Sequence, residues 1–324
     1  MKPFIYITRK LPEAIVAPLK REFEVEMWEK EDAPVPRDIL LEKAEKASAL
    51  LTMLSDKVDS ELLQNAASLK VVANLAVGYD NIDLEAAKEK GITITNTPDV
   101  LTETTADLTF ALLMATARRI VEADRYIKEG KWKSWSPLLL AGMDIHHKTM
   151  GIVGMGSIGE AVARRAKGFN MEVLYHNRSR KPEAEETLGV RYVSFDDLLA
   201  QSDFVVVLAP LNKETQGMFQ EDQFSKMKNT AIFINAARGA IVNEAALEQA
   251  LKRGEVAGAG LDVFETEPIS EEHPLLQLEQ VVAIPHIGSS SKATRYDMMT
   301  LCVENILAVL KGDNPKNSGE IKKS

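Results

Sequence analysis

Three side chains that could carry out acid–base chemistry follow predicted strands in the second half of the chain. Arg238 follows the apolar run 231–235, and His286 follows the run 281–284. Glu267 lies in the segment Leu261–Pro268, where acidic residues crowd and the pattern alone does not say which of them acts. In an open α/β sheet, ligands bind at the carboxyl ends of the strands, so these side chains are candidates for one common site.

The three residue types together suggest one reaction. An arginine can hold a carboxylate through two parallel hydrogen bonds. A histidine beside a carboxylate keeps its proton more readily and can donate it to a reacting oxygen. With a hydride donor, such a set would reduce a 2-keto acid to a 2-hydroxy acid. Each residue also has a structural interpretation: an exposed loop arginine for Arg238, a solvated acidic loop around Glu267 and a structural histidine for His286.

A binding motif for a hydride donor lies in the middle of the chain. The segment Gly154-Met155-Gly156-Ser157-Ile158-Gly159 matches G-x-G-x-x-G; an apolar pair precedes it and an alanine-rich helical pattern follows. In this pattern Gly154 allows a tight turn, Gly156 allows the backbone to approach a pyrophosphate, and Gly159 lets the helix pack close to the strand. The amino end of the helix then faces the anion. The alternative is a purely structural glycine turn.

The end of the next predicted strand bears on the choice of cofactor. An NAD-binding unit usually ends this strand with Asp or Glu, which binds the ribose 2′-hydroxyl. Here Asn177 occupies that place and is followed by Arg178, Ser179 and Arg180. An arginine can bind a 2′-phosphate that a carboxylate would repel. We therefore expect NADPH to be preferred, with NADH possible; the alternative is a solvated basic turn.

Composition narrows the class of protein. The 324 residues suffice for two domains, and 45% apolar with 27% charged residues is ordinary for a globular protein. The net charge of −9 argues against nucleic acid as the main partner. The single Cys302 excludes an intrachain disulfide and is expected in the core. Scattered histidines indicate no metal site, and without a long apolar run or a signal-peptide pattern we expect no membrane association and a cytoplasmic protein.

Strand-like runs alternate with helical runs, which predicts α/β architecture with parallel sheets. A long helix is expected from Thr102 to about Lys128, an irregular apolar segment at Trp132–Met143, and a helix ending at Lys311. Residues 314–324 are polar and expected to be disordered. The predicted strands are Phe4–Thr8, Phe23–Trp28, Ala49–Leu54, Val71–Ala76 and Ile92–Asn96, then Gly151–Val153, Met171–Tyr175, Arg191–Val193, Phe204–Leu208, Ala231–Asn235, Gly258–Val263 and Val281–Ile284.

At this point the chain resembles the D-isomer-specific 2-hydroxyacid dehydrogenase family over nearly its whole length. Within that family it is most similar to the glyoxylate/hydroxypyruvate reductase branch, which includes 2-ketogluconate reductases. Besides the glycine motif, the resemblance rests on Leu75–Asp83, Asn235–Gly239, Gly260–Pro268 and Pro285–Ser289.

The resemblance implies a role for each candidate. Arg238 would bind the substrate carboxylate and polarise the keto oxygen. Glu267, the acid before Pro268, would hydrogen-bond His286, which would be the proton donor in reduction. The backbone amides of Val77 and Gly78 would hold the other side of the carboxylate. The remaining cofactor contacts implied are Pro210, Thr215, Ala236, Ala237 and Asp262.

The resemblance also implies architecture and partners. The fold would consist of two Rossmann-like, doubly wound parallel-sheet domains. A flavodoxin-like substrate domain, 1–98 plus 288–324, would contain a dinucleotide-binding domain, 99–287, inserted into it, with a hinge between them. The substrate would be a small 2-keto or 2-hydroxy acid, and the assembly a homodimer that uses the apolar segment. Some relatives of this branch place an aromatic residue in that segment, where Leu138-Leu139-Leu140 stands here, so a wider pocket for a sugar acid is expected.

Other functions fit parts of this pattern. A non-catalytic, dinucleotide-sensing corepressor has the same fold, but the complete set of candidate residues favours an enzyme. Formate dehydrogenases pair Gln with His, whereas Glu267 is acidic. A phosphoglycerate dehydrogenase is disfavoured by the region around Arg178.

Overall fold

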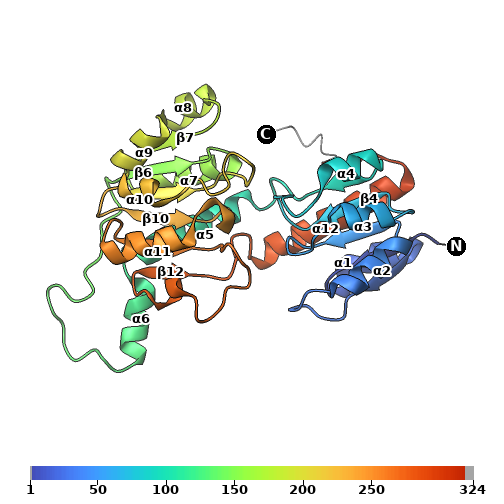
Figure 1. The fold of residues 1–324 in the computed structure, drawn as a ribbon, viewed down its shortest axis with the longest axis horizontal. Coiled ribbons are helices and arrows are strands. Elements are labelled where there is room, and N and C mark those ends of the chain that lie inside the picture. Colours follow the sequence, from blue (N-terminus) through green and yellow to red (C-terminus); the bar gives the residue numbers. More distant parts are fainter. Residues whose placement is uncertain (1, 318–324) are drawn as a thin grey trace. The chain divides into compact units, whose positions relative to one another are not determined.

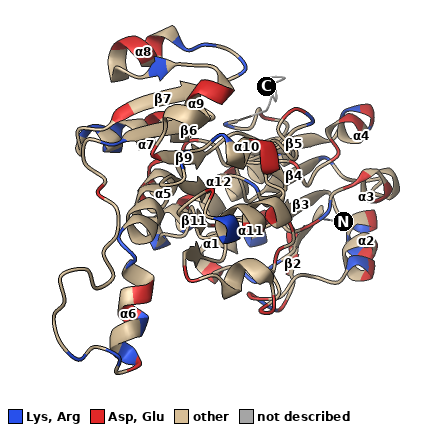
Figure 2. Cartoon of the chain, turned by 60° about the vertical axis from the view of Figure 1, so that its left-hand side comes forward, with Lys and Arg blue, Asp and Glu red and all other residues tan. Residues whose placement is uncertain are grey.

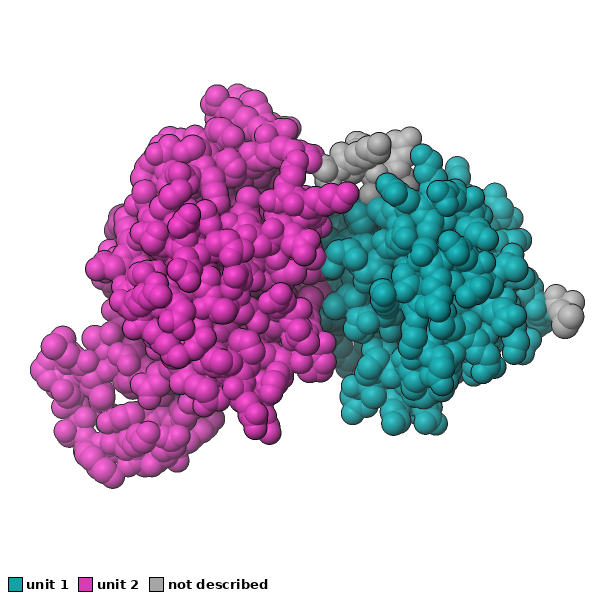
Figure 3. Space-filling view, in the orientation of Figure 1, with its two compact units in different colours: residues 1–101, 291–324 teal, residues 102–290 magenta. Residues whose placement is uncertain are grey.

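The computed structural model describes residues 2–317 and divides into two compact units (Figure 1). Unit 1 comprises Met1–Leu101 and Ser291–Ser324, and unit 2 comprises Thr102–Ser290, so unit 2 is inserted into unit 1 (Figure 3). The expected domain boundaries fall a few residues before these junctions. Of the stretch expected to be disordered, 318–324 lies outside the described residues. The expectation is wrong for 314–317, where Lys316 and Asn317 form hydrogen bonds with Asn305.

Unit 1 contains a parallel five-stranded sheet in the order β2-β1-β3-β4-β5, which is the flavodoxin-like order. Every residue of β3 and β4 is buried, as expected for central strands of a sheet covered by helices. Its elements are β1 (Phe4–Ile7), α1 (Glu13–Glu22), β2 (Glu24–Met27), α2 (Arg37–Lys46), β3 (Ala49–Thr52), α3 (Ser60–Asn65), β4 (Val71–Asn74), α4 (Leu84–Glu89), β5 (Thr93–Thr95) and α12 (Lys292–Lys311).

Helix α12 returns the chain to unit 1, where it packs against β4 and α1. Its Cys302 is fully buried, which confirms the prediction that this residue belongs to the core. Among the helices of residues 2–317, none is long and apolar enough to cross a membrane.

Unit 2 contains a parallel seven-stranded sheet in the order β12-β11-β10-β9-β6-β7-β8. The strand order reverses at β6, which is the strand that leads into the glycine motif, and ligands of such sheets bind at this point. Its elements are α5 (Thr102–Ala117), α6 (Ile120–Lys128), β6 (Thr149–Val153), α7 (Ser157–Lys167), β7 (Glu172–His176), α8 (Pro182–Leu188), β8 (Arg191–Tyr192), α9 (Phe195–Gln201), β9 (Phe204–Val207), α10 (Glu221–Ser225), β10 (Ile232–Asn235), η1 (Gly239–Ile241), α11 (Glu244–Arg253), β11 (Gly258–Leu261), η2 (Pro274–Gln277) and β12 (Val281–Ala283).

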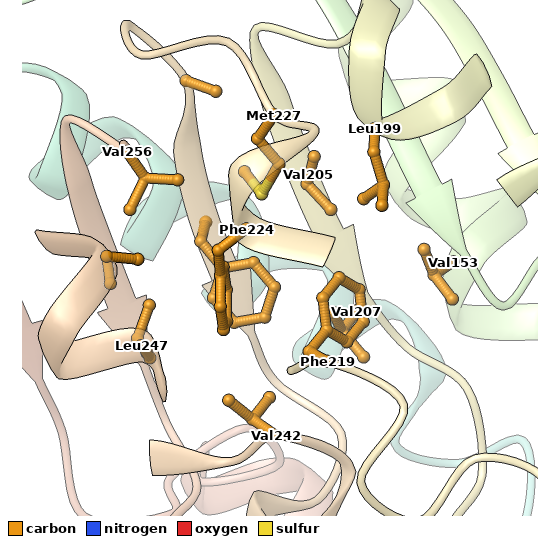
Figure 4. Close-up of a cluster of buried hydrophobic side chains, with 14 of the residues drawn as sticks. Val153, Leu199, Val205, Val207, Phe219, Phe224, Met227, Val242, Leu247 and Val256 are labelled. Carbon is orange, nitrogen blue, oxygen red and sulfur yellow. The ribbon is translucent and has the colours of Figure 1, made fainter. Parts of the chain in front are cut away.

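Alternate residues of the central strands supply two separate cores. Val205 and Val207 of β9 pack with side chains of α9, α10 and α11 on one face, where Phe219 and Phe224 also lie (Figure 4). Phe204 and Val206 point to the other face and pack with α5 and α7. This two-residue period places a hydrophobic layer on both sides of the sheet, so the strands are held rigidly and their carboxyl ends are fixed.

All twelve predicted strands are present, which confirms the fold class predicted from the alternating pattern. The prediction of one continuous helix from Thr102 to Lys128 is wrong, because the helix ends at Ala117 and α6 begins at Ile120. The returning chain explains the break. The Met143 amide donates to the Ala117 carbonyl at 2.8 Å, in place of the amide that a continuous helix would supply. Arg119 then adopts a left-handed φ of +53° and is the N-cap of α6.

Helix α6 and the irregular segment after it form an arm, which we define as residues 120–142. The arm extends away from the sheet of unit 2 in two views (Figures 1 and 2), and α6 itself carries both acidic and basic residues (Figure 2). No residue of α6 is buried. The large exposed apolar side chains of the arm are Ile120, Val121, Ile127, Trp132, Trp135, Leu138 and Leu139.

Candidate active site

The glycine motif forms the turn between β6 and α7. Gly154 has a φ of +103°, and a Cβ there would lie 2.4 Å from the amide nitrogen of Ala209. A Cβ at Gly159 would lie 2.4 Å from the Gly154 carbonyl oxygen, so only glycine lets α7 start this close to the turn. Two of the three glycines are therefore required by the packing of the turn itself.

Gly156 has a different environment, because a Cβ there would meet nothing within 4 Å. It is the N-cap of α7, and no side chain caps the helix. The amides of Ser157, Ile158 and Gly159 in the first turn are thus left to a ligand, and the helix dipole favours an anion there. The open space and the uncapped helix end fit the pyrophosphate of a dinucleotide.

Asn177 joins the end of β7 to this turn. Its Oδ1 accepts a hydrogen bond from the Met155 amide at 2.6 Å, and its Nδ2 donates to the Met155 carbonyl at 3.4 Å. Asn177 therefore fixes the middle of the glycine motif through both ends of its amide.

The two arginines after Asn177 differ in how firmly they are held. Arg180 binds both carboxylate oxygens of Glu185 at 2.7 and 2.6 Å, and this pairing, together with the Tyr175 hydroxyl, lowers the pKa of Glu185 to about 2. Arg178 lies 3.8 Å from Glu214, too far for a hydrogen bond, and both side chains are largely exposed. Of the two arginines, Arg178 is thus the one whose guanidinium is able to move and bind a ligand together with its neighbour Ser179.

Glu267 and His286 form a hydrogen-bonded pair at the carboxyl ends of β11 and β12. Glu267 Oε2 lies 2.7 Å from His286 Nδ1, and its Oε1 accepts the Phe264 amide at 3.0 Å. Burial acts to raise the pKa of Glu267, but the hydrogen bond and charge of His286, the Phe264 amide and the charge of Arg238 together hold this pKa below its usual value. Glu267 is therefore favoured as the ionised carboxylate that faces the His286 ring.

The backbone of His286 is held as tightly as its ring. Its φ is +51°, and its amide donates to the Asp262 carbonyl at 2.8 Å. Asp262 is almost fully buried, and its Oδ1 accepts the Ile287 amide at 2.7 Å. Since Nδ1 bonds Glu267, Nε2 is the ring nitrogen left to face a substrate.

Arg238 lies in the turn after β10, next to the strands that carry the pair. Asn235, the last residue of β10, donates to the Arg238 carbonyl at 3.0 Å and accepts the Ala237 amide at 3.1 Å. Behind it, a Cβ at Gly239 would lie 1.8 Å from the carbonyl carbon of Phe264, so the turn presses against the loop that leads to Glu267. Arg238, Glu267 and His286 are thus brought together at neighbouring strand ends.

The other predicted cofactor residues follow β9 and β10. Thr215 is nearly buried and donates from its hydroxyl to the Pro210 carbonyl at 2.7 Å. Ala236 and Ala237 are half-buried in the turn before Arg238. Val77 and Gly78 belong to unit 1, where they follow β4.

Two supporting residues escaped the sequence reasoning. Asn235 was predicted only as the end of a strand, and Asp262 only as a nicotinamide contact, whereas each holds the backbone of a candidate residue. A polar residue at the end of an otherwise apolar strand, as in Ile-Phe-Ile-Asn, is the signal that could have found Asn235.

A Rossmann sheet with a glycine turn at its switch point and an Arg–Glu–His set along the same edge defines an NAD(P)-dependent oxidoreductase. Residues 110–288 match the model of the D-isomer specific 2-hydroxyacid dehydrogenase NAD-binding domain. The chain belongs to the D-isomer-specific 2-hydroxyacid dehydrogenase family. This confirms the predicted family and the prediction of an enzyme that acts on 2-keto and 2-hydroxy acids.

Named relatives cover almost the whole chain. A glyoxylate reductase of Korarchaeum cryptofilum is 50% identical over 98% of this chain and 96% of its own length. The crystal structure of the TT0316 protein from Thermus thermophilus is 45% identical, covers 97% of this chain and 99% of its own, and has a TM-score of 0.91. An NADPH-dependent glyoxylate/hydroxypyruvate reductase from Sinorhizobium meliloti, in complex with NADP and malonate, is 34% identical over 96% of this chain and 94% of its own, with a TM-score of 0.82.

Proposed function

We propose that this protein reduces glyoxylate, or a close relative such as hydroxypyruvate or 2-ketogluconate, to the D-2-hydroxy acid with NADPH. The observation that carries the proposal is the 2.7 Å contact between Glu267 and His286 beside the Arg238 turn. The glyoxylate reductases at about half identity over nearly the full chain support the choice of substrate class.

Each residue of the set has one role. Arg238 binds the carboxylate of the substrate and polarises its keto oxygen. His286 donates the proton on Nε2 to that oxygen, and Glu267 stabilises the imidazolium and fixes its orientation. A bound nicotinamide supplies the hydride to the keto carbon. In the opposite direction His286 removes the hydroxyl proton. The amides of Val77 and Gly78 are proposed as the second set of donors to the carboxylate.

The cofactor is held by the groups around the glycine motif. The first-turn amides of α7 bind the pyrophosphate, and Asn177, Arg178 and Ser179 contact the ribose and its 2′-phosphate. Pro210, Thr215, Ala236 and Ala237 would line the remaining length of the cofactor, and Asp262 would contact the nicotinamide. An asparagine in place of the acid that NAD-binding units use supports NADPH as the preferred form, with NADH as a weaker substitute.

The test is a kinetic panel. We expect loss of NADPH absorbance with glyoxylate, hydroxypyruvate and 2-ketogluconate, and a lower KM for NADPH than for NADH. A strong preference for glyoxylate over the larger acids would contradict a pocket widened by Leu138-Leu139-Leu140. An equal or lower KM for NADH would refute the cofactor assignment, and no turnover of any 2-keto acid would refute the proposed function.

We also propose that the protein is a homodimer that uses the arm. Trp135 and Leu138 are 78% and 81% exposed, and such large apolar side chains on an extended segment favour a second copy as the partner. Replacing both by serine should convert the dimer to a monomer in analytical ultracentrifugation. A monomeric parent protein, or a variant that remains dimeric, would contradict the proposal.

A further inference from the structure

The loop that follows β4 in unit 1 has its carbonyl groups held one after another. The Ala76 carbonyl accepts the Thr97 amide at 2.9 Å, and the Val77 carbonyl accepts Asn96 Nδ2 at 2.7 Å. The Gly78 carbonyl accepts Asn74 Nδ2 at 3.0 Å. Three successive peptide groups are therefore fixed by groups of unit 1.

Fixing these carbonyls also aims the amides. In a trans peptide the C=O and the following N–H point in opposite directions, so each held carbonyl turns the next N–H away from its partner. The amides concerned are those of Val77, Gly78 and Tyr79. Within residues 2–317 none of them donates to another backbone group. An N–H group that no other backbone group uses is left as a donor for an anion such as a carboxylate.

Asn96 is itself held, through a chain of asparagines that starts in α12. Buried Asn305 donates to Asn317 Oδ1 at 2.5 Å and accepts the Lys316 amide at 3.0 Å. Asn317 Nδ2 in turn donates to the Asn96 backbone carbonyl, and it lies 3.3 Å from Asn96 Oδ1. With its oxygen facing a donor, Asn96 must present its Nδ2 to Val77. The donors all run in one direction, which strengthens each bond in the chain.

A second set of polar groups holds Asn74. The Thr52 hydroxyl donates to Asn74 Oδ1 at 3.1 Å, so Nδ2 is the atom that faces the Gly78 carbonyl. Asn81 Nδ2 also lies 3.3 Å from Asn74 Oδ1, and it donates to the Asp56 carbonyl at 2.9 Å. Because Asn74 is fully buried, its amide has one orientation that satisfies all of its partners.

We propose that Asn96, oriented by Asn317 beyond the last helix, is a positioning residue that aims the Gly78 amide at the substrate carboxylate. The inference rests on the proposed function, since it assumes that Val77 and Gly78 bind that carboxylate. It adds that residues 313–317, although they lie at the far end of the sequence, take part in substrate binding through the Asn96 side chain.

The experiment measures KM and binding in two variants. Asn317→Ala should raise the KM for glyoxylate about two- to tenfold, the range expected for one lost neutral hydrogen bond. Asn96→Ala should raise it by at least as much, while the KM for NADPH stays within about twofold. Because both changes act on one chain of bonds, the double variant should be no worse than Asn96→Ala. Binding of oxamate, an unreactive carboxylate, should weaken in parallel in calorimetry.

Lys316→Ala is the matched control. Lys316 is next to Asn317 in the sequence, and its replacement removes the 2.8 Å ion pair between Lys316 and Glu304. Asn96 and Asn317 stay in place, so the glyoxylate KM should not change. Unchanged glyoxylate KM and oxamate affinity in Asn317→Ala would overturn the inference, even if Asn96→Ala fails to fold. Equal effects of Lys316→Ala and Asn317→Ala would also overturn it. If the parent protein binds oxamate but reduces no 2-keto acid, the proposed function fails while the binding comparison still decides the inference.

Discussion

Replacing Glu267 by glutamine tests the acid–base pair with the smallest change in shape. Glutamine keeps the length of the side chain and can still accept the Phe264 amide, but it removes the charge that faces His286. A hydrogen bond to a charged group contributes roughly 1.5–3 kcal/mol. Because the two side chains remain 22% and 29% exposed, the lower end of that range applies. Because about 1.4 kcal/mol corresponds to a factor of ten in rate, the loss of this interaction in the transition state should lower kcat about tenfold.

The pH dependence follows from the lowered pKa of Glu267. Burial raises this pKa, but the hydrogen bond and charge of His286 lower it by more, so Glu267 loses its charge only as pH falls through the lowered pKa. Near neutral pH the parent enzyme has this charge and Glu267→Gln lacks it, so kcat should be about tenfold lower in the variant. The two kcat values should approach each other as pH falls and Glu267 is protonated, with little change in the KM for NADPH.

The assay is the pH profile of kcat for glyoxylate reduction. Glu265→Gln is the matched control, since it removes a charge two positions away on an exposed side chain, whereas the bond to the His286 ring comes from Glu267. Its profile should coincide with that of the parent enzyme. A profile in Glu267→Gln that also coincides with the parent would refute the assigned role of the pair.

Three further changes probe other parts of the site. His286→Ala should lower kcat about 10²- to 10⁴-fold with a folded protein by circular dichroism, and near-normal turnover would remove this residue from the mechanism. Arg178→Ala should raise the KM for NADPH and leave that for NADH unchanged; an equal effect on both would mean that Arg178 does not contact the 2′-phosphate. Gly239→Ala should cost about 1–3 kcal/mol in urea unfolding, because its Cβ would overlap the Phe264 backbone, and unchanged stability would show that this backbone yields easily.

Local sequence patterns were sufficient to predict the sheets. Strands such as Phe-Val-Val-Val and Ile-Phe-Ile-Asn are apolar on both faces, and turn residues bound them. The break between α5 and α6 was beyond such reasoning. Its cause is a hydrogen bond between Ala117 and Met143, which are far apart in the sequence, together with Gly142, whose Cβ would lie 2.2 Å from the Ala117 carbonyl oxygen. The periodicity of apolar residues in a helix does not show that the amide of a distant residue, Met143, will bond the Ala117 carbonyl.

The sequence predicted which side chains could act in the reaction, but it did not predict the residues that hold the backbone of the site in place. Arg238 and His286 stood out because each follows a strand, whereas Glu267 was separated from its acidic neighbours by the family resemblance alone. The asparagines at 96, 305 and 317 have no spacing that connects them. Only the fold brings α12 beside β4 and β5, so their chain of hydrogen bonds could not be predicted.

The two carboxylates beside His286 show how environment divides roles between similar groups. Burial raises the pKa of Asp262, and although the Ile287 amide and the charge of His286 oppose this effect, the net shift is upward. Glu267 is less buried and faces the imidazole ring, and its pKa is lowered. The opposite shifts support the proposal that Glu267 is the charged partner of His286 in the reaction. Asp262 instead accepts the Ile287 amide, while its carbonyl accepts the His286 amide, so it holds the loop in place. Removing Asp262 should therefore displace the ring, whereas removing the charge of Glu267 should leave the ring in place and lower kcat.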